Sequence, residues 1–295
     1  MTCTVRAPAK INLHLRILGR RPDRFHEVCT LLQSVGLHDT LAFRRRPGPL
    51  TVRSRSSGMP RDRANLVWAA ASALWTANGR TGDPTGAAVT ITKRIPAAAG
   101  LGGGSSDAAA ALRGLCAVWG IAASDGWLRA VAARVGSDVP YFLAGGAALA
   151  RGRGERVRGV PDIEPLWVVL SCPPFGVSTA DAYRWFDAAA RPGGAGPAAL
   201  PRGWRRGLRG LANDLEPVVV ERHPEVGRMI ERLRRTGALR AAMTGSGSAV
   251  FGLYPTHAAA HAARLAARRR GWRAVVSRTT GRAEFRRGTV LRPGR

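Results

Sequence analysis

The sequence is poor in lysine. Of its 295 residues only Lys10 and Lys93 are lysines, against 44 arginines. Acidic residues are also few, 19 against 46 basic ones, so the formal net charge is +27. Such a charge is typical of proteins that bind nucleic acid or an anionic membrane surface. Because lysine itself is so rare and the arginines are spread along the chain, a coding bias toward arginine is the simpler explanation. We expect a solvated basic surface, no membrane association and no specific nucleic-acid partner.

Cysteines are few and far apart. None of the four forms a Cys-x-x-Cys pair, which argues against a zinc ribbon or a dithiol redox motif: Cys3, Cys29, Cys116 and Cys172. There is no uncharged apolar run of about 18 residues, so no transmembrane helix is predicted. Polar residues interrupt the only early apolar run, which argues against a signal peptide. These absences favour a cytoplasmic protein with reduced cysteines.

The hydrophobic pattern predicts an α+β protein, because strands come first and mixed strands and helices follow. Strands are predicted over 2–6, 11–18, 28–35, 40–44, 147–151, 167–171, 249–254 and 273–277. Helices are predicted over 65–77, 127–134 and 256–270, and a phosphate loop with its helix over 96–119, which a strand-like run over 88–92 precedes. Residues 215–220 and 225–235 are further elements, with no type assigned to them. Residues 188–210 are rich in proline, glycine and alanine, and we expect a flexible connection there.

One segment predicts a phosphate site. Residues 96–112 read PAAAGLGGGSSDAAAAL. The glycines Gly102 to Gly104 allow φ above zero and a close approach to a ligand. Ser105, Ser106 and Asp107 are good N-cap residues before an alanine-rich helix, whose free N–H groups attract an anion. The run is neither a Walker A motif, since no Lys-Ser/Thr follows, nor a dinucleotide fingerprint, since position 105 is serine. A plain tight turn is the alternative.

Two further segments resemble functional motifs. In residues 7–15, APAKINLHL, apolar and polar residues alternate as in a strand, which places Lys10 and Asn12 on one face. A lysine kept where arginine is habitual suggests that a compact charge is needed. Residues 243–251, MTGSGSAVF, place a Gly/Ser turn before an apolar strand, a pattern that a structural hairpin also shows.

Together these three segments resemble the motifs of the GHMP small-molecule kinases. Within that superfamily the sequence is most similar to the 4-diphosphocytidyl-2-C-methyl-D-erythritol kinases. The similarity runs from residue 7 to about residue 282, with further matching segments at 25–26, 136–140, 174–179 and 213–216. The resemblance implies a two-domain GHMP kinase fold, with a ribosomal-S5-domain-2-like domain over 1–160, a ferredoxin-like domain over 161–284 and the active site in the cleft between them. We expect residues 285–295 to be a disordered basic tail, and the protein to be a monomer or a homodimer.

The resemblance also implies the chemistry, which is transfer of the ATP γ-phosphoryl group to a substrate hydroxyl. Asp138 would act as the base, and Lys10 would keep it ionised and orient the hydroxyl. ATP would bind at Pro96, Gly100, Leu101, Gly102, Gly103, Gly104, Ser105 and Ser106, with Asn65 and Lys93 near the nucleotide. Either Ser105 or Ser106 would offer a hydroxyl to Mg²⁺. The sequence does not identify the other metal ligands.

A small-molecule substrate that carries cytidine diphosphate is implied as well. Its binding residues would be Asn12, Phe25, His26, Thr179 and Tyr183, with the ring of Phe25 stacked on cytosine. The chain departs from the family at two positions, with Phe25 in place of tyrosine and Arg24 in place of glycine. The alternatives are another GHMP kinase, acting on mevalonate-type or homoserine substrates, and an arginine-rich nucleic-acid-binding protein of S5-like fold.

Overall fold

Two long antiparallel strands form the backbone of the fold. The computed structural model describes residues 2–54, 63–189, 200, 201, 203–205, 208 and 210–293. Strand β1 (Thr2–Arg20) pairs with β2 (His26–Pro49) across a turn at 21–25. We predicted four separate strands here. That prediction is wrong because β1 and β2 continue through the predicted gaps at 7–10 and 36–39, and a β-bulge between Pro8 and Lys10 shifts the register without ending the strand.

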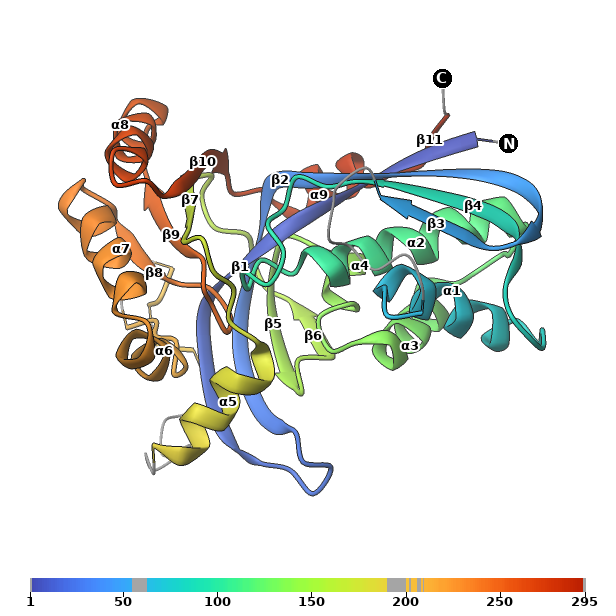
Figure 1. Cartoon of the computed structure of the whole chain (residues 1–295), viewed down its shortest axis with the longest axis horizontal. Coiled ribbons are helices and arrows are strands. Elements are labelled where there is room, and N and C mark those ends of the chain that lie inside the picture. Colours follow the sequence, from blue (N-terminus) through green and yellow to red (C-terminus); the bar gives the residue numbers. More distant parts are fainter. Residues whose placement is uncertain are drawn as a thin grey trace.

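The first sheet has the order β11-β1-β2-β4-β3, and β5 and β6 extend it from β2. Its remaining strands are β3 (Thr51–Ser54), β4 (Thr85–Thr92), β5 (Ala147–Gly152), β6 (Arg156–Gly159) and β11 (Arg292–Pro293). Helices α1 (Leu66–Ala77), α2 (Gly103–Trp119) and α3 (Asp125–Val135) pack together against this sheet, and the short α4 (Tyr141–Ala144) follows α3 (Figure 1). The predicted helices over 65–77 and 127–134 are confirmed.

The second sheet has the order β10-β7-β9-β8, with every neighbouring pair antiparallel. Its strands are β7 (Trp167–Cys172), β8 (Arg240–Met243), β9 (Val250–Tyr254) and β10 (Arg273–Arg278). The helices of this half are α5 (Thr179–Ala188), α6 (Glu216–Arg222), α7 (Pro224–Arg235) and α8 (His257–Arg268). The path β-α-β-β-α-β is ferredoxin-like, as expected. Most of the connection expected over 188–210 lies outside the described residues.

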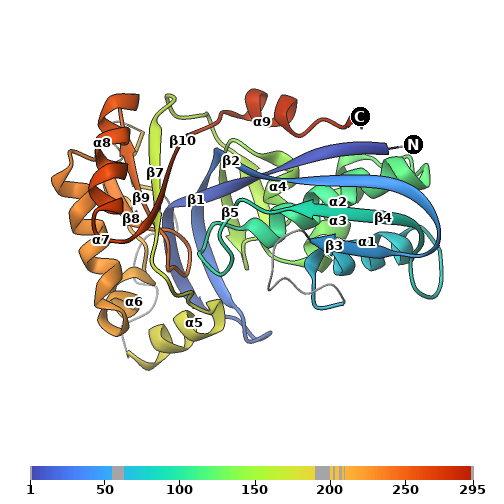
Figure 2. The same ribbon diagram turned by 45° about the horizontal axis from the view of Figure 1, so that its top comes forward.

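The C-terminal segment returns to the first sheet, as Figure 2 shows. Helix α9 (Arg282–Gly288) buries Phe285, and β11 pairs with β1 at Cys3 and Thr4. Our expectation of a disordered tail over 285–295 is therefore wrong up to residue 293. The segment is rich in arginine, which predicts exposure, but the buried ring of Phe285 anchors it to the rest of the protein. None of the described helices is long and apolar enough to span a bilayer.

Strand β1 also contacts the second half of the molecule (Figure 1). The Leu15 N–H donates to the Ala212 carbonyl at 2.8 Å, and the Asp214 N–H donates to the Leu15 carbonyl at 2.9 Å. Leu15 and Ile17 pack into the core of the second half, whereas Val5 and Ala7 pack into that of the first. The middle of β1, with Lys10 and Asn12, thus lies where the two halves meet.

Candidate active site

The side chain of Lys10 connects β1 to the glycine-rich loop. Its Nζ donates to the Asn12 side chain at 2.5 Å and to the Gly100 carbonyl at 2.9 Å. The Lys10 N–H also donates to the Leu101 carbonyl at 3.1 Å. Asn12 is itself buried, and its amide donates to Thr30 at 2.8 Å. Asn12, expected to bind substrate, is here engaged in positioning Lys10.

The loop between residues 96 and 103 has two left-handed glycines, Gly100 at φ +73° and Gly102 at φ +71°. A Cβ at Gly100 would lie 2.1 Å from the Thr244 carbonyl oxygen, and one at Gly102 would lie 2.7 Å from the Phe142 ring. Glycine is needed at both positions for conformation and for space. Gly103, by contrast, is already the first residue of α2.

The expected serine and aspartate N-caps are not used. Gly102 is the N-cap of α2, and Ser105, Ser106 and Asp107 lie in the first turns of the helix. Ser106 is buried, and its hydroxyl donates to the Pro8 carbonyl at 2.7 Å. Ser105 is only half-buried. Of the two candidate Mg²⁺ ligands, Ser105 is therefore the more accessible one.

The third motif packs directly on the first two. Thr244 accepts a hydrogen bond from the Asn12 N–H at 3.0 Å, and the Ala249 N–H donates to the Ala99 carbonyl at 3.2 Å. The Asn213 amide donates to the Gly245 carbonyl at 2.8 Å. These contacts bring together three segments that lie far apart in the chain. Thr244 and Asn213 both lie in segments that resemble the family, but we assigned neither a role at the site, because the sequence does not show which backbone groups they hold.

Asp138 completes the pair with Lys10. It precedes α4, and its Oδ2 lies 3.6 Å from Lys10 Nζ. The side chain of Asp138 is 33 % exposed, whereas that of Lys10 is 4 % exposed. Burial lowers the pKa of Lys10, and the nearby Asp138 opposes that shift. A buried cation beside an accessible carboxylate is suited to orienting a hydroxyl for deprotonation.

Apart from Asn12 in β1, the expected cytidine-binding residues lie at the β1–β2 turn, at the start of β2 and on α5. The rings of His26 and Tyr183 stack with centroids 4.7 Å apart. His26 Nε2 lies 2.8 Å from Asp187 Oδ1, a contact that the sequence did not indicate. Burial, and then the charge of Asp138, raise the pKa of Tyr183.

Phe25 and Thr179 lie at the edges of this group. Phe25 is 50 % exposed. Thr179 begins α5, and its hydroxyl lies 3.1 Å from that of Ser246 in the Gly/Ser turn. Arg24, the departure from the family's glycine, has φ +66°. The turn thus keeps a left-handed residue there, at a steric cost that glycine would not carry.

Two residues expected near the nucleotide have structural partners. Asn65 is the N-cap of α1, where its side chain accepts the Val67 N–H. Lys93 pairs with the buried carboxylates of Asp39 and Asp107. Burial and the neighbouring Asp39 raise the pKa of Asp107 to about 7, although Lys93 opposes the shift. Lys93 Nζ would lie 3.2 Å from a Cβ at Gly103, so this cluster supports the start of α2.

Comparisons with known proteins show the family of the chain. The model of the GHMP kinase N-terminal domain matches residues 65–146, and that of the GHMP kinase C-terminal domain matches 198–273. A 4-diphosphocytidyl-2-C-methyl-D-erythritol kinase of Pelotomaculum thermopropionicum is 44 % identical over 285 residues, which cover 95 % of this chain and 98 % of the relative. A kinase of the same name from Moorella thermoacetica is 45 % identical, over 85 % of this chain and 89 % of the relative.

Solved structures show the same fold. A crystal structure of a 4-(cytidine 5'-diphospho)-2C-methyl-D-erythritol kinase is 37 % identical, with a TM-score of 0.78 over 94 % of this chain and 99 % of that one. A homoserine kinase of Cytophaga hutchinsonii shares the fold at 18 % identity, with a TM-score of 0.70 over 98 % of this chain and 97 % of that one. The chain belongs to the GHMP kinases and, within them, to the family of 4-diphosphocytidyl-2-C-methyl-D-erythritol kinases.

Proposed function

We propose that this protein transfers the γ-phosphoryl group of ATP to the 2-hydroxyl of 4-diphosphocytidyl-2-C-methyl-D-erythritol, in the methylerythritol phosphate route to isoprenoids. The observation that carries the proposal is the buried Lys10 beside the accessible carboxylate of Asp138, next to the glycine-rich loop. The relatives of about 44 % identity, which bear the name of this kinase over nearly the whole chain, support the choice of substrate.

In the proposed mechanism Asp138 accepts the proton of the 2-hydroxyl as its oxygen attacks the γ-phosphorus. The bond between the γ-phosphorus and the β–γ bridging oxygen breaks and ADP leaves, while Lys10 stabilises the negative charge on the transferring group. Its other hydrogen bonds, to Asn12 and the Gly100 carbonyl, hold the ammonium group in one place. Positioning and charge stabilisation are the main sources of catalysis in phosphoryl transfer.

ATP and Mg²⁺ fit the residues at the start of α2. The left-handed turn at Gly100 and Gly102 leads into a helix of 17 residues, whose first amides have no partners within the helix. Ser105 would place a hydroxyl oxygen near the phosphates, the ligand type that Mg²⁺ prefers. Mg²⁺ would supply charge neutralisation of the phosphate oxygens. Among the described residues no group of three or more His, Cys, Asp or Glu side chains is placed to hold a metal ion.

The substrate's cytosine would bind at the turn and at α5. The exposed ring of Phe25 would stack on the base, and His26, Tyr183 and Thr179 would complete the pocket.

A domain boundary at 160/161 is part of the proposal. It is supported by the two sheets, since β6 ends at Gly159 and β7 begins at Trp167. The four buried free cysteines are consistent with the reducing cytoplasm.

The proposal is tested by ADP release with ATP, Mg²⁺ and the cytidine substrate, with mevalonate and homoserine as parallel substrates. Turnover of the cytidine substrate alone is the expected result. Turnover of mevalonate or homoserine instead would retain the fold and reject Phe25, His26 and Thr179 as a cytidine site. Size-exclusion chromatography with light scattering would test whether the protein is a monomer or a homodimer.

A further inference from the structure

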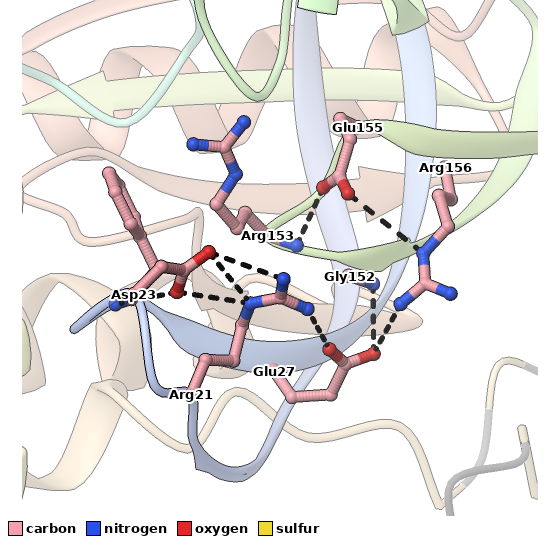
Figure 3. A network of polar contacts seen from close by, with 8 residues as sticks. Arg21, Asp23, Glu27, Gly152, Arg153, Glu155 and Arg156 are labelled. Carbon is pink, nitrogen blue, oxygen red and sulfur yellow. Dashed lines mark hydrogen bonds and ion pairs between the residues drawn. The ribbon is translucent and has the colours of Figure 1, made fainter.

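A network of charged side chains joins the β1–β2 turn to the β5–β6 turn. Glu27 pairs with Arg21 at 2.7 Å and with Arg156 at 3.2 Å (Figure 3). Asp23 pairs with Arg21 at 3.2 Å, and Glu155 lies 3.9 Å from Arg156. The carboxylates of this network are therefore all engaged with Arg21 or Arg156.

Arg153 belongs to the same turn, yet its charged group has no such partner. Its N–H donates to Glu155 at 2.6 Å, which fixes its backbone. Within the described ranges no carboxylate lies within 4.0 Å of its guanidinium group, and Figure 3 shows the side chain pointing away from the acidic residues. The guanidinium carbon lies 4.8 Å from the centroid of the exposed Phe25 ring. Among the described residues, the Arg153 guanidinium group thus has no carboxylate within 4.0 Å and lies beside the proposed cytosine site, with Asp23 acting on it only at longer range.

The next residue of the turn, Gly154, lies beside Asp138, the proposed general base. A Cβ at Gly154 would lie 3.6 Å from Asp138 Oδ1, and the Cα atoms of residues 153 and 154 are about 3.8 Å apart. Arg153 therefore lies between Phe25 and Asp138. In the proposed complex the cytosine ring contacts Phe25 and the reacting hydroxyl reaches Asp138. The group that links them therefore has to lie along this turn.

We propose that Arg153 binds the diphosphate that links the nucleoside to the reacting alcohol. This inference rests on the function proposed above, since it needs the base at Phe25 and the hydroxyl at Asp138. The planar guanidinium group matches phosphate oxygens in a bidentate geometry, which a lysine ammonium does not. Arg153 would thus select nucleoside diphosphates over uncharged nucleosides, and it takes no part in the proton transfer.

The test compares the binding of CDP and of cytidine by isothermal titration calorimetry. We expect Arg153→Ala to raise the Kd for CDP by roughly tenfold or more, the scale of one charge-assisted hydrogen bond. We expect the Kd for cytidine to change by less than about twofold, since stacking carries no net charge. For CDP, the Kd of the Arg153→Lys variant should lie between that of the wild type and that of Arg153→Ala. The matched control is Arg158→Ala, which removes an exposed arginine from β6 outside the network and should alter neither Kd.

Two outcomes would overturn the inference. An unchanged Kd for CDP would show that the diphosphate lies elsewhere, and equal losses for CDP and cytidine would assign Arg153 to the aromatic pocket. If the wild-type protein fails to bind CDP, the proposed function itself falls. Thermal unfolding of each variant checks the fold. In turnover assays Arg153→Ala should raise KM for the cytidine substrate and leave KM for ATP unchanged.

Discussion

Lys10 Nζ lies 3.6 Å from Asp138 Oδ2, with the lysine almost fully buried and the aspartate one-third exposed. The two residues come from β1 and from the turn before α4, 128 positions apart in the chain. The difference in burial between Lys10 and Asp138 gives them different roles. The cation is held by Asn12 and the Gly100 carbonyl, and the carboxylate stays open to a substrate.

Asp138→Asn should abolish most turnover. The amide has nearly the shape of the carboxylate but does not accept the hydroxyl proton, and loss of a general base costs on the order of 100- to 10,000-fold. We expect KM for ATP to stay near the wild-type value and thermal stability to fall, because the amide no longer offsets the buried charge of Lys10. Steady-state kinetics and calorimetry measure both effects. Near-wild-type kcat in this variant would reject Asp138 as the base.

Gly100→Ala should disrupt the contact between the glycine-rich loop and the Gly/Ser turn. The new Cβ would lie 2.1 Å from the Thr244 carbonyl oxygen, and the φ of +73° disfavours alanine. We expect loss of activity and a free energy of unfolding lower by about 2 kcal/mol or more. Gly126→Ala is the control, since nothing lies within 4 Å of its Cβ and it sits inside α3. Because Gly126 is the second residue of α3, alanine there should stabilise by less than the interior value of about 1 kcal/mol, and a similar loss in both variants would contradict the packing argument.

Arg24→Gly should stabilise the protein by about 1 kcal/mol. Arg24 has φ +66°, which a side chain makes unfavourable and glycine tolerates. Urea unfolding measures the change. Arg24→Ala keeps the Cβ and removes the charge, so it should give little gain. If the alanine variant gains as much as the glycine variant, charge rather than backbone strain explains the effect.

Stability should fall as the pH is lowered from about 6.5 to about 4, through His14. Burial, and then the charges of Arg16 and Arg240, lower the pKa of His14 from 6.5 to about 4. The Ala212 N–H also donates to its Nδ1 at 3.0 Å. Between these pH values the unfolded chain binds the extra proton, so stability is lost on acidification by about 3 kcal/mol, and no more is lost below pH 4.

Urea unfolding at pH 7 and at pH 4.5 measures this loss. His14→Asn keeps an acceptor for the Ala212 N–H and does not titrate, so its loss between the two pH values should be smaller. His261→Asn, on the exposed face of α8, should leave the loss as in the wild type. Equal pH dependence in the wild type and His14→Asn would assign the acid sensitivity to other groups.

The sequence predicted helices α1, α2, α3 and α8, the α+β class and the loop before α2, because these depend on local patterns. The continuity of strand β1 across residues 7–10 was missed, since every residue there is buried and a β-bulge shifts the register, so the pattern of alternating burial is lost. The partners of Lys93 were also missed. Asp39 lies 54 positions before it and Asp107 14 positions after it, and only tertiary packing brings both carboxylates to one ammonium group. The N-cap of α2 fell on Gly102 because the loop, rather than the best capping residue, sets where the helix begins.

The most direct test of the account measures ADP release by the wild type and by Asp138→Asn, with ATP, Mg²⁺ and 4-diphosphocytidyl-2-C-methyl-D-erythritol. The account predicts turnover by the wild type, none with mevalonate or homoserine, and at least a hundredfold lower kcat in the variant. Equal turnover by both proteins, or wild-type activity on mevalonate or homoserine in place of the cytidine substrate, would contradict it.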